Sequence, residues 1–212
     1  MAAYVRPELP HRDYIDDDGQ PIYYGNRWGG EPAPENAYSR TSHLERFDGV
    51  HVVAEALISW LVDTYDVMAE NDAGVVGDFV HVPAGVVRAV RLTPRSVDGA
   101  PITFAFTDFP GVLVHAGALH AFHFPDCGCD ACDDNILYLL DELEWTVRAI
   151  VTGGYSESFS PLPGSWVEHA LHEPGVASAS GRTRTQDFPS WRVDAARKIV
   201  PRNGQWQAWP ER

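Results

Sequence analysis

The sequence has few cysteines and no long apolar run, and each shortage excludes a class of protein. Only three of the 212 residues are cysteine, and an odd number leaves one thiol outside any disulfide. No run approaches the roughly 18 apolar residues of a membrane-spanning helix. The first residues also lack the apolar stretch of a secretion signal. We therefore expect a cytoplasmic protein that does not enter membranes.

Positive charge is also scarce. The chain has 16 Lys and Arg against 30 Asp and Glu, and the net charge of −14 argues against broad binding to nucleic-acid backbones. From Gly181 to Arg212, seven basic residues face three acidic ones, so this tail carries +4 and the remainder −18. The tail could hold an anionic ligand or a nucleic acid, or it could fold back on the acidic body. Charge asymmetry alone favours the second interpretation.

Familiar catalytic motifs are missing as well. The chain contains no Walker loop, no G-x-G-x-x-G and no G-x-S-x-G. The run from His169 to Glu173 reads H-x-x-H-E, which matches neither H-E-x-x-H nor H-x-x-E-H. We interpret its histidines as surface or hydrogen-bonding groups. Nucleotide and hydrolase chemistries thus lose their usual sequence support.

What is present predicts an ordinary globular protein. With 44% hydrophobic residues, a chain of this length can build one large core, and we expect a single domain over 1–212. Residues 1–47 are rich in Pro, Gly, Asp and Tyr and predict an extended arm. The core is expected over 48–172, and a loop-rich, basic segment over 173–212.

Apolar spacing predicts an α+β fold in which an antiparallel β-meander packs against two main helices. Asp133 or Asp134 is placed to cap the second helix. The expected helices cover 48–68 and 134–151. The expected strands cover 86–93, 102–107, 112–115 and 119–124, followed by shorter ones over 155–159 and 166–171.

All three cysteines lie in one run, Cys127-Gly-Cys-Asp-Ala-Cys132, at the turn between the predicted fourth strand and the second helix. Cys129 and Cys132 form a C-x-x-C pair, which can reach one ion about 2.3 Å from each sulfur. Gly128 can take positive φ, which would let Cys127 turn its thiolate toward the same centre. In a reducing compartment this spacing indicates a zinc site.

Zinc needs a fourth ligand, and the nearest candidate is His123, four residues before Cys127. It lies on the strand face opposite Phe122 and Phe124, so it is free to turn toward the loop if the two rings face the core. A water molecule in the fourth position would make the site potentially catalytic. Other side chains that could fill this position are His120, His115, Asp130 and Asp126.

The closest catalytic pattern is that of the zinc deaminases, which pair H-x-E with P-C-x-x-C. Here the upstream triplet is His115-Ala116-Gly117, which has no carboxylate, and Cys129 follows a glycine. Both differences count against a deaminase. We predict instead a structural zinc clip with Cys127, Cys129, Cys132 and His123 as ligands, in a protein with a binding or regulatory role.

Two alternatives stay open. One is a small metalloenzyme with an open fourth zinc position and Asp126, Asp130 or Glu168 as acid or base. The other is a thiol redox sensor. The acidic body and the aromatic-rich arm favour a protein partner over a nucleic acid, and the oligomeric state is left open.

Several segments resemble an uncharacterised bacterial family, domain-of-unknown-function family six-two-two-six. The resemblance extends from about Tyr4 into the region of Trp166. It implies a single-domain cytoplasmic protein and carries no assigned activity. The segments are Tyr4-Val-Arg-Pro-Glu-Leu-Pro, Gly85-Val-Val-Arg-Ala-Val-Arg-Leu-Thr-Pro94, Phe109-Pro-Gly and His115-Ala-Gly-Ala-Leu-His120, with the cysteine run.

Overall fold

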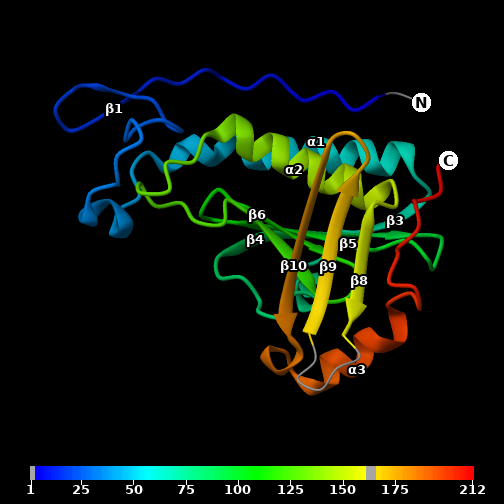
Figure 1. The fold of residues 1–212 in the computed structure, drawn as a ribbon. Coiled ribbons are helices and arrows are strands. Elements are labelled where there is room, and N and C mark those ends of the chain that lie inside the picture. Colours follow the sequence, from blue (N-terminus) through cyan, green and yellow to red (C-terminus); the bar gives the residue numbers. More distant parts are fainter. Residues whose placement is uncertain (1–2, 161–165) are drawn as a thin grey trace.

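The computed structural model describes residues 3–160 and 166–212 and is built around a five-stranded sheet (Figure 1). Its strands are β3 (Val67–Glu70), β4 (Val86–Pro94), β5 (Ile102–Thr107), β6 (Val112–Ala116) and β7 (His120–Phe124). They are arranged in that order, and every neighbouring pair is antiparallel. The predicted α+β class and the predicted meander are therefore confirmed.

Two helices, α1 (Asp48–Thr64) and α2 (Ile136–Val151), lie side by side over one face of this sheet (Figure 1). Val52 of α1 is 45% exposed and does not belong to the buried side of the helix. The neighbouring Trp60 faces the arm, where its ring packs 5.6 Å from that of Tyr4. The buried side of α1 consists of Val50, Val53, Ala54, Leu57, Ile58 and Leu61.

The arm contains little regular structure but is held on the helices by polar contacts. The Tyr4 hydroxyl donates a hydrogen bond of 2.8 Å to Glu144 of α2, and Arg6 pairs with Glu144 and Asp141 at 2.5 Å. The arm therefore covers the outer side of the helices. Its short elements are β1 (Tyr14–Ile15), β2 (Pro21–Ile22) and the 3-10 helices η1 (Glu35–Ser39) and η2 (Leu44–Phe47).

The helix expected over 48–68 ends at Thr64, and Met68 lies in β3 instead. The Asp66 N–H donates to the Pro210 carbonyl at 2.7 Å, and the Arg212 N–H donates to the Thr64 carbonyl at 3.1 Å. These partners come from the far end of the chain, so apolar spacing within 48–68 cannot reveal them. A 3-10 helix, η3 (Ala73–Asp78), then leads to β4.

A second, three-stranded sheet crosses in front of the first (Figure 1). It consists of β8 (Tyr155–Phe159), β9 (Trp166–Glu173) and β10 (Ala177–Arg184), arranged β10-β9-β8 with antiparallel pairing. The segment expected to be loop-rich thus contains β10, the short η4 (Thr185–Asp187) and a helix, α3 (Ser190–Ile199). Small residues and two arginines make up β10 and give it no apolar alternation, which is why the sequence did not predict a strand.

The C-terminal residues return to the core. Trp206 and Trp209 are only 2% and 3% exposed, and the Trp209 indole donates to the Ala100 carbonyl at 2.8 Å. Arg192 of α3 donates to the carbonyls of η3 and its neighbour, at Asp78 and Phe79. This part of the basic tail therefore folds back on the acidic body.

A buried carboxylate joins the two sheets. Glu157 of β8 is 1% exposed and accepts hydrogen bonds from the backbone N–H groups of Ala118 and Leu119, at 2.8 and 3.1 Å, and from the Trp206 indole at 3.0 Å. Burial raises the pKa of Glu157, although these hydrogen bonds lower it. Gly117 has a φ of 64°, and a Cβ there would overlap the Glu157 carboxylate. The absence of a side chain at Gly117 thus lets the turn between β6 and β7 approach β8.

We expect Glu157→Ala to lower the free energy of unfolding by about 3 kcal/mol or more, because three buried donors lose their acceptor. Glu157→Gln keeps one acceptor oxygen and should cost less. Urea denaturation of the three proteins measures both differences. Equal stability of Glu157→Ala and the parent protein would contradict this role.

Candidate metal centre

The cysteine loop connects β7, the last strand of the five-stranded sheet, to α2. The sulfur atoms of Cys127, Cys129 and Cys132 all lie within 4.8 Å of one another, and those of Cys129 and Cys132 are 3.5 Å apart. Cys127 and Cys132 are exposed, and Cys129 is half-buried. The structure therefore brings the three predicted thiols together into a group that could hold a metal ion.

Local backbone contacts produce this arrangement. The Cys132 N–H donates to the Cys129 carbonyl at 3.3 Å, which closes the C-x-x-C segment into a turn. The Cys129 N–H lies 3.5 Å from the Cys127 sulfur and directs that side chain inward. Gly128 does not take the positive φ that we expected. It is required for space, since a Cβ at this position would overlap the Phe109 ring.

Asp130, in the middle of the C-x-x-C segment, is fully buried and anchors the loop. One carboxylate oxygen accepts the Ser42 N–H at 2.7 Å, and the other accepts the Ser42 hydroxyl at 2.7 Å. The surrounding cations are Arg40 at 3.1 Å, Arg27 at 3.3 Å and Arg46 at 3.6 Å. All of these partners belong to the arm.

The arm also contacts the backbone of the loop. The Asp130 N–H donates to the Arg40 carbonyl at 2.8 Å, and the Arg46 guanidinium donates to the Gly128 carbonyl at 3.1 Å. Arg46 in turn lies over the Tyr24 ring, 4.1 Å from its centroid. The shape of the loop is thus fixed by contacts that do not involve the sulfur atoms.

The charge network also fixes the protonation of Asp130. Burial alone would raise its pKa, but hydrogen bonds from Ser42 and Arg40 and the charge of Arg27 lower the pKa to about 2. Both oxygens are occupied by these partners. Asp130 is therefore an anchor, and it is not placed to act as the fourth metal ligand or as an acid or base.

The three thiols influence one another. A hydrogen bond from Cys127 lowers the pKa of Cys129, whereas partial desolvation and the two neighbouring thiols raise the pKa of Cys132 to about 12. Three adjacent thiolates would repel one another without a cation between them. Thiolate sulfur is the donor that zinc and other soft metals prefer, so this donor set fits a zinc ion.

His123 lies on the face of β7 opposite Phe124, as expected, and its side chain is exposed. Its ring nitrogens are not within 4.8 Å of all three sulfurs. The reserve ligands lie elsewhere: His115 is buried beneath Phe79, and His120 stacks on His169 with ring centroids 3.3 Å apart. The structure therefore brings together the three cysteines without a histidine.

The loop also differs from expectation where it enters α2. Asn135 caps the helix by accepting the Leu137 N–H at 2.9 Å, and neither Asp133 nor Asp134 does so. Asp133 instead has a φ of 51° and accepts the Arg27 N–H at 2.7 Å. Asp133, which the sequence offered as a helix cap, thus binds the backbone of the arm instead.

A hollow of about 290 Å³ reaches the loop at Asp126. Glu142 of α2 and the rings of His120, His123 and His169 also line it. Burial and the nearby charges of Asp126 and Asp134 raise the pKa of Glu142. Of the carboxylates that the sequence offered as acid or base, Asp126 is thus the one that lines a cavity next to the cysteine loop.

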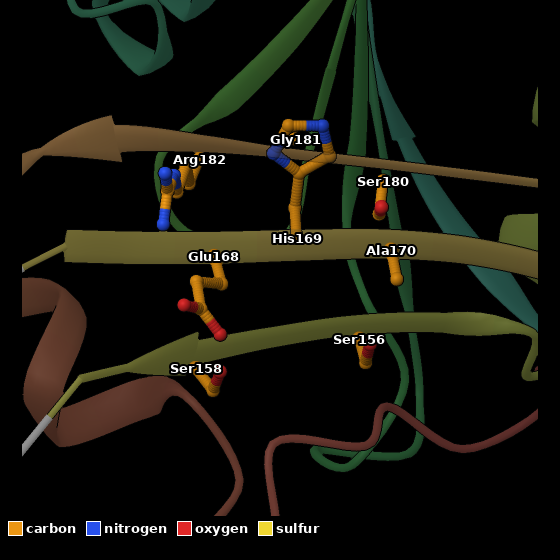
Figure 2. Close-up of a pocket in the computed structure, with 8 residues that line it drawn as sticks. All are labelled: Ser156, Ser158, Glu168, His169, Ala170, Ser180, Gly181 and Arg182. Atoms are coloured by element: carbon orange, nitrogen blue, oxygen red, sulfur yellow. The ribbon is translucent and has the colours of Figure 1, made fainter.

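The other proposed acid, Glu168, lies in a different hollow on the three-stranded sheet (Figure 2). The H-x-x-H-E run also has other partners. His169 stacks on His120, and Glu173 forms an ion pair of 2.8 Å with Arg148. This run does not form a metal motif within the described part of the chain.

The fold and the loop define an α+β protein with a three-cysteine group that could hold a metal ion. A family model matches residues 10–212, and the chain belongs to the family of unknown function DUF6226. The family resemblance seen in the sequence is thereby confirmed. No curated protein and no solved structure matches the chain. No helix of the described residues combines the length and the apolar content needed to cross a membrane.

We expect Asp130→Asn to lower the free energy of unfolding by about 3 kcal/mol, because it leaves three arginines around a neutral amide. Asp126→Asn is the matched control, since this carboxylate lies in the same loop but is exposed. Urea denaturation measures both variants. Equal effects of the two substitutions would contradict the anchoring role of Asp130.

Histidine burial predicts a pH dependence. Burial is the main cause that lowers the pKa of His115 to about 4, of His120 to about 3 and of His169 to about 4. In the unfolded chain these histidines bind protons near pH 6.5, whereas in the folded protein they do so only near pH 4 or below. Their contribution to the free energy of unfolding is therefore fully present above pH 6.5 and is lost as the pH falls toward 4. The urea concentration at the midpoint of unfolding should fall less between pH 6.5 and pH 4 in His169→Gln than in the parent protein. An unchanged pH profile in that variant would contradict the assignment.

Proposed function

We propose that this protein binds one zinc ion through Cys127, Cys129 and Cys132, and that the ion acts as a structural clip. The observation that carries the proposal is the assembly of three thiols by a loop whose anchor, Asp130, is separate from the metal ligands. Zinc is favoured because its structural sites commonly use three or four cysteines. The cytoplasmic setting expected from the sequence keeps such thiols reduced.

The clip would secure a junction of three parts of the fold. The loop follows β7, precedes α2 and is enclosed by the arm through Ser42 and Arg40. A metal ion that joins Cys127 to Cys132 would shorten the path between strand and helix and limit local opening. This arrangement supports a binding or regulatory role, with a protein as the proposed partner.

The fourth ligand remains a proposal. His123 is the candidate, because it is exposed, close in sequence and on the side of β7 that leaves its ring free to turn. When bound, its neutral imidazole would complete a Cys3His set. Its rotation is part of the hypothesis, since the ring is outside the group that the three sulfurs form.

One observation favours the alternative of a metalloenzyme. Cys127 and Cys132 are exposed, and a hollow that contains Asp126 and Glu142 lies next to the loop. A water molecule as the fourth ligand would then have a carboxylate nearby as a base. The redox-sensor alternative is supported by the 3.5 Å separation of the Cys129 and Cys132 sulfurs, which is short enough for a two-electron oxidant such as a peroxide to join them as a disulfide, with loss of both thiol protons.

Zinc removal provides the test. Native mass spectrometry should find one zinc per chain, and Cys132→Ser should abolish it. Chelator should lower the melting temperature by about 5 to 10 °C, a few kcal/mol for a chain of this size. The same chelator should leave Cys132→Ser unaffected, which controls for effects outside the loop.

A protein that is isolated without metal and whose thiols are alkylated equally before and after chelation would contradict the zinc proposal. If the protein binds zinc stoichiometrically but its melting temperature does not change after chelation, the metal site would stand and the structural role of the ion would be contradicted. In that case the metalloenzyme alternative would be favoured.

A further inference from the structure

The outer strand of the three-stranded sheet has an open edge. β10 is at the end of the strand order and pairs with β9 from Ala177 to Arg184 without a shift in register. Its sequence contains neither proline nor lysine, the residues that commonly block an edge. Within the described chain, no other strand pairs with this edge. Backbone groups that point away from β9 are therefore available to an added strand.

Two arginines on this strand are held without an anionic partner. Arg182 and Arg184 both lie over the Trp166 ring, with guanidinium carbons 4.6 and 5.3 Å from its centroid. Arg148, by contrast, has a carboxylate partner, and Arg192 has carbonyl partners. Among the described residues neither Arg182 nor Arg184 has either kind of partner. Arg197 likewise lies over a ring, that of Phe159, but Arg182 and Arg184 differ from it because both are on the edge strand and share one tryptophan.

The nearest carboxylate in the sheet does not neutralise them. Glu168 is directly opposite Arg182 in the register, yet no ion pair forms between them. Figure 2 shows Glu168 extending toward Ser158 on β8, whereas Arg182 lies beside β10 on the same face of the sheet. The tryptophan therefore positions the guanidinium groups and leaves their N–H donors open to an external acceptor.

Each face of the three-stranded sheet has a hollow that reaches β10. On the face that carries Arg182, a hollow of about 400 Å³ is lined by the side chains of Ser156, Ser158 and Ser180. On the opposite face, the hollow of about 290 Å³ described above reaches Ala179. Because the side chains of a strand alternate between faces, an added strand could place its residues alternately toward each hollow.

We propose that β10 accepts an extended acidic segment of a partner protein as an added antiparallel strand, with alternate carboxylates on Arg182 and Arg184. Residues two apart on such a strand share a face, as the two arginines do. The intervening residues would be uncharged or basic, because Asp126 and Glu142 border the second hollow. This inference deepens the binding role proposed above.

A nucleic acid fits the same surface less well. One face of Trp166 is covered by guanidinium groups, so it does not offer an open platform on which a base could stack. A peptide, in contrast, can use the backbone groups of the edge, which carry no charge.

The test uses the full chain and a short fluorescein-labelled peptide in which Glu and Thr alternate. Fluorescence anisotropy should show saturable binding that weakens as salt is added. Arg182→Gln and Arg184→Gln should each weaken binding about tenfold, as expected for removal of a charged donor. Lys198→Gln and Arg202→Gln, each made singly, are the matched controls, because each removes one positive charge elsewhere in the basic tail and should have little effect.

Backbone pairing is tested with the peptide, so that protein folding is not at risk. Two further probes carry N-methyl groups on alternate backbone nitrogens, in opposite phases. Pairing with β10 predicts that one phase abolishes binding and the other retains it, because consecutive amides of a strand point in opposite directions.

Three results would overturn the proposal: no saturable binding of the peptide, equal binding by the arginine variants, or retained binding of both methylated probes. Tighter binding of a single-stranded oligonucleotide that the same arginine variants abolish would assign the surface to nucleic acid instead. Zinc content is measured separately, so any of these failures would leave the metal proposal intact.

Discussion

The ion-pair network around Asp130 is the interaction on which the cysteine loop depends. This carboxylate is fully buried, and the arm surrounds it with Ser42 and three arginines. A buried charge is tolerated only when it is paired and hydrogen-bonded, so the arm and the loop must form together. The network therefore links the arm, the end of β7 and the start of α2. Removing Asp130 would leave Arg27 and Arg46, whose side chains are largely buried, without this counter-charge.

This separation of anchor and ligand has a chemical consequence. In small zinc domains the metal itself supplies most of the folding free energy, because little core exists without it. Here α1, α2 and the five-stranded sheet form a large core, and Asp130 anchors the loop through contacts that do not use the sulfur atoms. The three sulfurs are then presented to solvent at metal-binding distance. Such a site would bind metal with little reorganisation, and metal loss would loosen the loop more than the core.

Features set by neighbouring residues could be predicted from the sequence, and features set by distant ones could not. The cysteine loop between strand and helix, α2 and the meander all follow from local spacing. The role of Asp130 was missed because its partner Arg40 lies 90 residues earlier. Glu157 was missed for the same reason, since it binds a turn 39 residues away. The chain around β3 is held by residues of the C-terminus, and β10 is a strand because it pairs with β9, so neither strand has a periodic apolar signal of its own.

The central claim is that the anchored loop binds one zinc ion through all three cysteines. X-ray absorption at the zinc edge of the purified full-length protein tests it most directly, because it counts the sulfur ligands. The account predicts three sulfurs at about 2.3 Å and one nitrogen or oxygen at about 2.0 to 2.1 Å. In His123→Ala the nitrogen signal should be replaced by oxygen. A zinc ion with fewer than three sulfur ligands, or a protein that holds no zinc, would contradict the account.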